Sequence, residues 1–208
     1  MTNTTQKLPA VILAGGRAKR MGGGDKGLRL VAGQRLIDRV ILRLSAQCSP
    51  VAINANGNAA RFSEFGLTVL PDHIENYAGP LAGVLAGMDW AASLGEKQVV
   101  SAAADTPFFP TDLAARLTSA AGPSGLALAA SPDRDGKVWQ HPTFGLWPVH
   151  LRDDLRKALE GGLRKIVHWT EKHAAGQAEF SAQPFDPFFN INSPEDVETA
   201  QDLARVWE

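Results

Sequence analysis

The feature that most constrains the fold is a continuous apolar run near the amino end, Leu8 to Ala14 (LPAVILA). Because the apolar residues do not alternate with polar ones, the run predicts a strand that is buried on both faces. Such strands occur in parallel sheets that carry helices on both sides. The rest of the chain continues in the same way, with short apolar runs separated by segments of helical periodicity.

This repeated pattern predicts a single-domain, Rossmann-like α/β fold with a mostly parallel, doubly wound sheet flanked by helices. The expected strands in the first part are Leu8–Ala14, Val51–Asn54, Leu67–Leu70 and Gln98–Ala102, and the expected helices are Arg35–Ala46, Ala59–Phe65, Leu81–Leu94 and Thr111–Ala120.

After residue 125 the pattern changes. Two apolar runs, Leu126–Ala130 and Thr143–Trp147, flank the turn sequence Asp133-Arg134-Asp135-Gly136, which is typical of a hairpin. Helices are expected at Pro148–Glu160 and Leu163–His173. A last helix begins after Ser193, a capping residue that is followed by proline at the first helical position.

Length and composition limit the class of protein. A chain of 208 residues predicts one domain, 8–208, after a flexible amino terminus, 1–7. The formal charge of −1 argues against a partner such as nucleic acid or an anionic membrane, and no run approaches the ~18 apolar residues of a membrane span. Cys48 is the single cysteine, so no intrachain disulfide can form, which fits a cytoplasmic location.

A glycine-rich, basic loop follows the first expected strand. Residues 13–27 read LAGGRAKRMGGGDKG, with six glycines in fifteen positions. Glycines let the backbone approach a ligand and turn successive N–H groups toward it. Four cations, Arg17, Lys19, Arg20 and Lys26, stand against one carboxylate, Asp25. Since ligands of open α/β sheets bind at the carboxyl ends of the strands, the loop predicts a polyphosphate site, the alternative being a flexible surface loop with solvated charges.

Two common phosphate motifs do not account for this loop. The spacing Gly22-x-Gly24-x-x-Gly27 matches the dinucleotide fingerprint, but it begins well after the strand and lacks the acidic residue expected ~20 positions later. The loop also fails as a P-loop, because glycine and not serine or threonine follows Lys26.

The pattern Leu-Ala-Gly-Gly-x-x-x-Arg-Met-Gly-x-x-Asp-Lys at 13–26 resembles the opening signature of nucleotidyltransferases with the sugar-nucleotide pyrophosphorylase fold, and is most similar to the molybdenum cofactor guanylyltransferase family. Further similar stretches follow in order along nearly the whole chain: Asn54-Ala55-Asn56, Pro71-Asp72, Gly79-Pro80-Leu81-Ala82-Gly83, Ala104-Asp105-Thr106-Pro107, Gln140-His141-Pro142-Thr143 and Asn190-Ile191-Asn192-Ser193-Pro194-Glu195.

The resemblance implies a nucleotide-diphospho-sugar transferase-like fold, with a nucleotide-binding half at 8–125 and an acceptor-binding half at 126–208. It implies transfer of GMP from GTP to the terminal phosphate of molybdenum-loaded molybdopterin, with release of pyrophosphate and with Mg²⁺ as the cofactor. The protein partners that it implies are molybdopterin-inserting and molybdoenzyme chaperone proteins.

The resemblance also implies roles for individual residues. Lys26 and Arg20 are expected to neutralise phosphate charge, and Asp105 is expected to hold the metal and to act in catalysis. The remaining residues implied are Leu13, Ala14, Gly15, Asn54 and Asp72 for the nucleotide, together with Lys26 and Asp105, and His141, Asn190 and Asn192 for the acceptor.

From the residues alone, structural interpretations of these side chains stay open. Asp105 can cap the turn at Thr106-Pro107, and Asp72 and Asn54 can satisfy nearby backbone groups at strand ends. The Asp-x-Asp at 133–135 is read as a hairpin turn and not as the metal-binding motif of sugar transferases. His168 and His173 are five positions apart, which does not favour a zinc site.

Three alternatives to the guanylyltransferase remain. The sister cytidylyltransferase has a similar loop, although Leu-Ala-Gly-Gly at 13–16 is more typical of the guanine branch. A sugar-phosphate nucleotidyltransferase usually has a longer chain. A non-catalytic nucleotide or pterin carrier on the same fold could lack the metal carboxylate, and the presence of both Lys26 and Asp105 argues against it.

Overall fold

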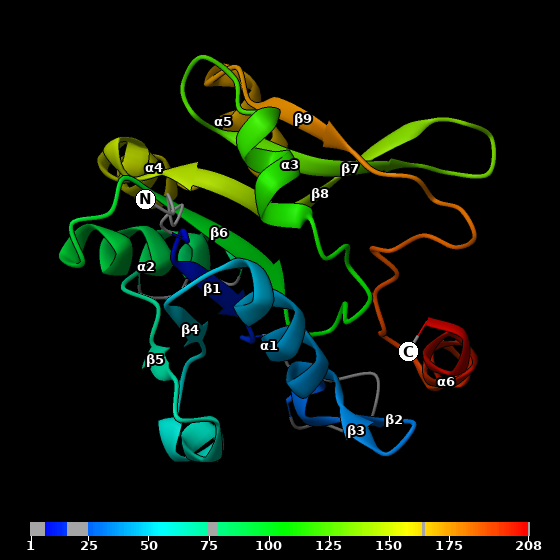
Figure 1. The fold of residues 1–208 in the computed structure, drawn as a ribbon. Coiled ribbons are helices and arrows are strands. Elements are labelled where there is room, and N and C mark those ends of the chain that lie inside the picture. The colour runs from blue at the N-terminus through cyan, green and yellow to red at the C-terminus, as the bar shows by residue number, and fades with distance from the viewer. Residues whose placement is uncertain (1–6, 16–24, 75–78, 164, 208) are drawn as a thin grey trace, which may run out of the picture.

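The computed structural model describes residues 7–15, 25–74, 79–163 and 165–207. Their centre is a seven-stranded sheet with the order β5-β4-β1-β6-β8-β7-β9 (Figure 1). The strands are β1 (Ala10–Leu13), β4 (Val51–Asn54), β5 (Thr68–Leu70), β6 (Gln98–Ala103), β7 (Ala127–Pro132), β8 (Val138–Pro148) and β9 (Gly176–Glu179). β8 runs antiparallel to both its neighbours and the other pairs are parallel, so the prediction of a mostly parallel sheet is confirmed.

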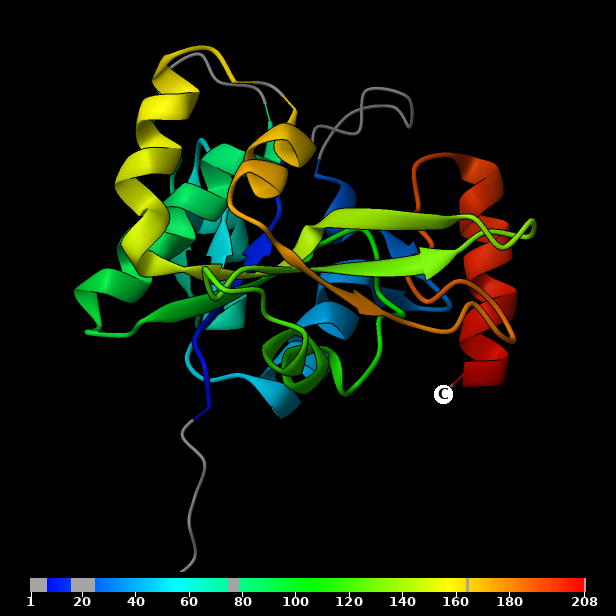
Figure 2. The ribbon, with the colours of Figure 1, turned by 90° about the horizontal axis from the view of Figure 1, so that it is seen from above.

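Helices cover both faces of this sheet (Figure 2). The helices α1 (Leu36–Gln47) and α3 (Leu113–Ser119) lie on one face, and α2 (Pro80–Ser93), α4 (Arg152–Glu160) and α5 (Ile166–Lys172) lie on the other. Each layer has its own buried apolar cluster, so both faces of the central strands are removed from water. This is why β1 is apolar at every position.

Helix α2 approaches the sheet closely because two glycines face it. A Cβ atom on Gly83 would lie 2.1 Å from Asn54 Oδ1, and one on Gly87 would lie 2.6 Å from Val11 Cγ1. Both distances are far below van der Waals contact, so no larger residue fits without movement. The amino end of α2 is thereby held against the carboxyl ends of β1 and β4.

The last helix, α6 (Pro194–Trp207), packs against a small hairpin formed by β2 (Leu30–Val31) and β3 (Gln34–Arg35). Its amino end has reciprocal capping bonds: Asp196 N donates to Ser193 Oγ at 3.2 Å, and Ser193 N donates to Asp196 Oδ2 at 2.9 Å. The predicted cap at Ser193 is confirmed.

Three short 3₁₀ helices complete the described elements: η2 (Lys26–Leu28), η3 (Ala59–Phe65) and η4 (Val149–Leu151). The helix expected at Pro148–Glu160 is divided, because β8 continues to Pro148 and η4 precedes α4. The helices expected at Thr111–Ala120 and Leu163–His173 are shorter, as α3 and α5.

The sequence pattern missed β9 and the β2–β3 hairpin. Strand β9 contains glycine, glutamine, alanine and glutamate, which are poor strand formers, and its place is set by parallel pairing with β7. The hairpin strands have two residues each, and their turn places Ala32 and Gly33 at φ of 48° and 80°. Both angles lie in the left-handed region typical of tight hairpin turns.

At the amino end, the ammonium group of Lys7 donates to the backbone oxygens of Ser45 and Ala46, in the last turn of α1, where a cation is favourable. The rest of the expected flexible terminus, 1–6, lies outside the described residues.

Cys48 is buried, and burial raises the pKa of its thiol to about 12. In the parts of the chain that the structure describes, no helix is long and apolar enough to cross a membrane.

Candidate functional site

The carboxyl ends of β4, β1 and β6 lie side by side at one edge of the sheet (Figure 1). Backbone bonds join the residues that follow these strands: Ala14 N donates to Asn54 O at 2.9 Å, and Ala104 N donates to Leu13 O at 3.1 Å. Leu13 and Ala14 therefore lie between β4 and β6, and Gly15 follows them, exposed. This is the edge at which ligands of open α/β sheets bind.

The structure brings together three of the predicted site residues around the Lys26 ammonium group. Lys26 Nζ lies 3.4 Å from Asp105 Oδ2 and donates a hydrogen bond to Asn192 Oδ1. Lys26 begins η2, Asp105 follows β6, and Asn192 precedes α6. Segments from three distant parts of the sequence thus place a cation, a carboxylate and an amide in contact.

Asp105 is a carboxylate in a largely buried position. Burial raises the pKa of Asp105 above its usual value, and the charge of Lys26 works in the opposite direction. Its backbone oxygen accepts from Ile191 N at 3.0 Å, which ties the segment before α6 to the end of β6. Because burial disfavours the ionised carboxylate, a further cation at this position would be favourable.

Asp105 has the chemistry of a magnesium ligand. Within the described residues, no group of three or more His, Cys, Asp or Glu side chains is arranged to hold a metal. Mg²⁺ does not need such a group, since one or two carboxylates together with substrate phosphates and water suffice. The residues present therefore fit Mg²⁺ bound with a nucleotide, and they do not resemble a structural zinc site.

Asn54, the last residue of β4, and Asp72, which follows β5, also lie together. Asn54 is 4% exposed, and its Nδ2 donates to Asp72 Oδ1 at 2.9 Å and to Leu70 O at 3.1 Å. Asn56 forms a reciprocal pair with Asp72, donating from Nδ2 to Oδ2 at 2.6 Å and accepting from the backbone N at 2.8 Å. Asp72 is thus oriented by two asparagines, whereas sequence reasoning had singled out only Asn54.

Another contact that sequence reasoning missed holds the end of the glycine-rich loop. Arg61, on η3, donates from Nε to Asp25 Oδ2 at 2.6 Å. Asp25 is the residue before Lys26. Nothing in the spacing of the sequence links positions 25 and 61.

The proposed acceptor residues do not all gather at Lys26. Asn192 does, whereas His141 belongs to a cluster beside β7 and β8. Its Nε2 is 2.7 Å from Ser131 Oγ, its ring stacks on Phe188 with centroids 4.3 Å apart, and Ser131 donates to Asp186 at 3.0 Å. Burial lowers the pKa of His141, opposed by the charge of Asp186.

Asn190 is exposed, two positions before Asn192. Arg20, for which a catalytic role was expected, lies outside the described residues, as do the other loop positions from 16 to 24.

The hairpin interpretation of residues 133–136 agrees with the structure. Asp133 Oδ1 accepts from the backbone N of Asp135 and of Lys137, both at 2.9 Å, and Oδ2 accepts from Trp139 Nε1 at 2.8 Å. Both carboxylate oxygens therefore serve the turn itself.

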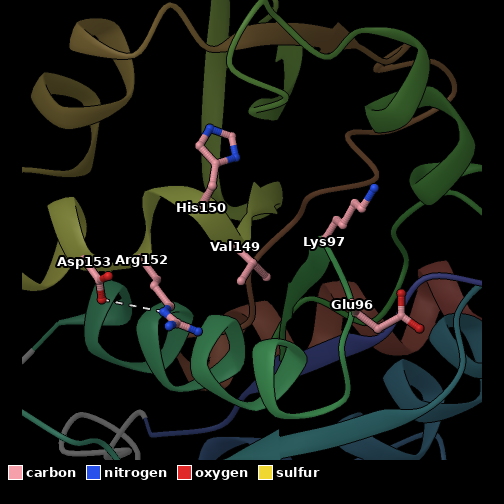
Figure 3. A pocket seen from close by; sticks show the side chains of 6 residues that line it. All are labelled: Glu96, Lys97, Val149, His150, Arg152 and Asp153. Carbon is pink, nitrogen blue, oxygen red and sulfur yellow. Dashed lines mark ion pairs between the residues drawn. The ribbon is translucent and has the colours of Figure 1, made fainter.

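A pocket of about 400 Å³ lies at the opposite end of β6 from Asp105 (Figure 3). It is lined by Glu96, Lys97, Val149, His150, Arg152 and Asp153. Because Lys97 precedes β6 and Asp105 follows it, the pocket is at the amino edge of this strand and is separate from the Lys26 site.

A mostly parallel α/β sheet that holds a lysine in contact with a carboxylate at its carboxyl edge is typical of the class of nucleotide-binding α/β proteins. The fold is similar to that of a molybdopterin-guanine dinucleotide biosynthesis protein A from Archaeoglobus fulgidus (TM-score 0.72, 22% identity, 96% of this chain and 100% of that one). It is also similar to a 2-C-methyl-D-erythritol 4-phosphate cytidylyltransferase from Thermus thermophilus (TM-score 0.69, 21% identity, 96% and 100%).

Residues 10–175 match the family model described as the MobA-like NTP transferase domain. A relative from Bradyrhizobium sp. (strain ORS 278) is 49% identical over 210 residues, covering 99% of this chain and 97% of the relative. One from Rhodopseudomonas palustris (strain BisB5) is 49% identical over 201 residues, covering 94% and 93%. Both carry the name molybdenum cofactor guanylyltransferase, and the chain belongs to this family.

Proposed function

We propose that this protein transfers the GMP part of GTP to the terminal phosphate of molybdopterin, which carries molybdenum as part of the substrate. An oxygen of the acceptor phosphate bonds to the α-phosphorus of GTP, the α–β bridging P–O bond breaks, and pyrophosphate leaves. The observation that carries the proposal is the contact of Lys26 with Asp105 and Asn192 at the carboxyl edge of the sheet, in a chain of this family.

Lys26 is proposed to act on the phosphates. Negative charge grows on the α-phosphate oxygens and on the departing pyrophosphate, so a cation held in place beforehand lowers the barrier. Asp105 and Asn192 restrict where the ammonium group can lie, and an amide oxygen orients it without cancelling its charge. The backbone groups of Leu13, Ala14 and Gly15 are proposed to hold the nucleotide beside it.

Asn54 and Asp72 are proposed to bind the ribose or the base. Asp72 has a fixed orientation because Asn54 and Asn56 each donate to one of its oxygens. A carboxylate oxygen has two acceptor positions, so Asp72 keeps the capacity to accept a hydroxyl or an amino group of the nucleoside. The hydrogen bonds within the site thus orient Asp72 without using all of its acceptors.

We also propose that the reaction depends on Mg²⁺, with Asp105 as its protein ligand. When bound, Mg²⁺ would supply charge neutralisation at the phosphate oxygens. The support for this is the position of Asp105, a largely buried carboxylate beside Lys26 at the carboxyl edge of the sheet, whose pKa is raised by burial so that a further cation is favourable there.

For the acceptor, His141, Asn190 and Asn192 remain the proposed residues. Asn192 contacts Lys26, so it is placed to touch both the nucleotide phosphates and the acceptor. His141 uses Nε2 in the contact with Ser131, so only its Nδ1 edge is proposed to face a pterin.

Since GTP is a cytoplasmic nucleotide, we propose a cytoplasmic location, with delivery of the product to molybdopterin-inserting and molybdoenzyme chaperone proteins.

The test is pyrophosphate release from GTP, CTP, ATP and UTP with Mg²⁺, with and without molybdenum-loaded molybdopterin. We expect release from GTP only, dependent on the pterin and abolished by chelation of the metal. Release from CTP instead would move the protein to the cytidylyltransferase branch. Binding of GTP without release under any condition would indicate a carrier.

Two variants connect this assay to the site. Lys26→Ala should lower kcat at least 100-fold, since positioned charge of this kind contributes about 10² or more to catalysis. Lys97→Ala removes an exposed lysine at the opposite edge of β6 and is the matched control, with activity like that of the wild type.

A further inference from the structure

The guanidinium group of Arg61 is held by three hydrogen bonds and one stacked ring. Besides the 2.6 Å contact of Nε with Asp25, Nη1 donates to Asn58 O at 2.5 Å and Nη2 donates to Asn56 O at 2.8 Å. The group also stacks over the ring of Phe62, 4.6 Å from its centroid, and Phe62 is fully buried. A planar fork held by three acceptors and a buried ring has little freedom to turn.

Through its bond to Asp25, the guanidinium group fixes the backbone beside Lys26. Before Lys26, Asp25 is bound to Arg61. After it, the buried Gly27 packs against Ala104, the residue that follows β6, so closely that a Cβ atom on Gly27 would lie 3.0 Å from Ala104 Cβ. The chain is therefore anchored immediately before and immediately after the lysine. Its ammonium group lies between Asp105 and Asn192.

Through its bond to the backbone oxygen of Asn56, the same guanidinium group fixes the segment that orients Asp72. Arg61 holds the backbone oxygen of Asn56, and the side chain of Asn56 makes two hydrogen bonds with Asp72. One guanidinium thus contacts both the segment of the phosphate-binding lysine and the segment of the nucleoside-binding carboxylate.

We propose that Arg61 is a positioning residue that couples the phosphate and nucleoside parts of the nucleotide site, acting through Asp25 on Lys26 and through Asn56 on Asp72. The proposal rests on the proposed function for the identity of the substrate as GTP. Arg61 itself touches no reacting atom. Its role is to fix the spacing between two groups that one nucleotide must meet at the same time, so that binding does not first have to order them.

Arg35, which contacts Glu64 and Phe65 at the end of η3, offers a matched control. It bonds Asp38 Oδ2 at 2.8 Å and Glu64 Oε1 at 2.5 Å, and it stacks over Phe65 at 4.6 Å. Like Arg61, it has three hydrogen bonds and one stacked ring, but its acceptors are all carboxylate oxygens and none of its partners belongs to the predicted site. A loss caused only by loosening of η3 should appear in Arg35→Gln as well.

The experiment measures kcat and the KM for GTP in Arg61→Gln, Asp25→Asn, the double variant and Arg35→Gln. Loss of a charge-assisted hydrogen bond typically changes an equilibrium by about tenfold or more, so we expect roughly tenfold lower kcat in both single variants. The double variant should be no slower than the slower single variant, because the two residues act through one contact. Arg35→Gln should stay within about twofold of the wild type.

The KM separates the two halves of the proposal. It should rise roughly tenfold in Arg61→Gln, which also releases Asn56, and stay unchanged in Asp25→Asn. Arg61→Lys can keep the ion pair with Asp25, but one ammonium group cannot reproduce a planar fork. It should therefore recover kcat and retain the raised KM.

Losses that multiply in the double variant, or an equal loss in Arg35→Gln, would overturn the proposal. So would wild-type kcat and KM in a folded Arg61→Gln. If Arg61→Gln does not fold, Asp25→Asn and Arg61→Lys decide the question. Calorimetric measurement of GTP binding to the same variants distinguishes failure of the coupling from failure of the proposed function. If the wild type binds GTP but transfers nothing, the proposed function is refuted. Weaker GTP binding by Arg61→Gln than by Arg35→Gln would still support the coupling.

Discussion

Substitution of Gly83 by alanine should damage the nucleotide site through packing alone. The new Cβ atom would lie 2.1 Å from Asn54 Oδ1, 2.8 Å from Asn54 Cγ and 2.9 Å from Leu13 Cδ2. Asn54 cannot move away easily, because it is buried and bound to Leu70 O and Asp72. Either α2 moves outward or Asn54 loses these bonds, and Asp72 loses one of the donors that orient it.

The expected size follows from two opposing effects. Overpacking of this kind costs about 1–3 kcal/mol, and replacement of glycine by alanine inside a helix returns up to ~1 kcal/mol. Because a 2.1 Å contact places the cost at the upper end of that range, the net loss should be about 2 kcal/mol, which lowers Tm by about 4–8 °C for a chain of this length. The KM for GTP should rise by about tenfold, the usual effect of one disturbed charge-assisted hydrogen bond.

Gly87→Ala is the control, one helical turn further along α2. Its Cβ atom would meet Val11 Cγ1 at 2.6 Å, in the apolar core and away from the polar site residues. Thermal melting should show that both variants are destabilised, whereas steady-state kinetics should show a raised KM only in Gly83→Ala. Equal KM increases in the two variants, or an unchanged Tm in Gly83→Ala, would refute the reasoning.

Three further outcomes are expected. Burial raises the pKa of Asp105, so the folded protein loses stability as the pH rises through that pKa and the buried carboxyl ionises. Asp105→Asn, which cannot ionise, should therefore have a higher Tm than the wild type at neutral pH and an equal Tm in acid, while guanylyl transfer is lost. Burial lowers the pKa of His141, so the neutral ring stabilises the fold above its ordinary pKa of about 6.5, and this stability is lost as the pH falls through the lowered pKa. In His141→Gln, the fall of Tm below about pH 6.5 should therefore be smaller than in the wild type. An unchanged profile of Tm against pH would contradict this. Asp196→Ala removes the acceptor for the backbone N of Asn192 and Ser193, so melting should show a loss of about 1 kcal/mol, with slower pyrophosphate release.

The elements that could be predicted are those whose side chains alone require burial. Strands such as β1 and β4 are apolar at nearly every position because helices cover both of their faces, and that pattern is visible in the sequence. Strand β9 is different, because only Ala178 is buried and its neighbours are polar. Its conformation comes from pairing with β7, a long-range contact that no local pattern records.

The same distinction applies to the candidate site. Lys26, Asp105 and Asn192 could be selected because each lies in a stretch that resembles a known family, and the structure brings them into contact. Arg61 could not be selected, since an arginine on a short helix has no pattern of its own, and its importance depends on which carboxylate it reaches. Gly83 lies in a stretch that was noted, but only the structure shows that a side chain there would collide with Asn54.

Contacts of one lysine explain why so much of the chain is needed for a small site. The backbone of Lys26 is held through Asp25 by η3, and its ammonium group is held by Asp105 after β6 and by Asn192 before α6. The match to the family model ends at residue 175, so Asn192 lies outside the matched segment. Yet Ile191 N bonds Asp105 O, and the α6 cap fixes the backbone of Asn192. The C-terminal segment is therefore part of the site, and a chain shortened before residue 190 should keep the sheet but lose the amide that orients Lys26.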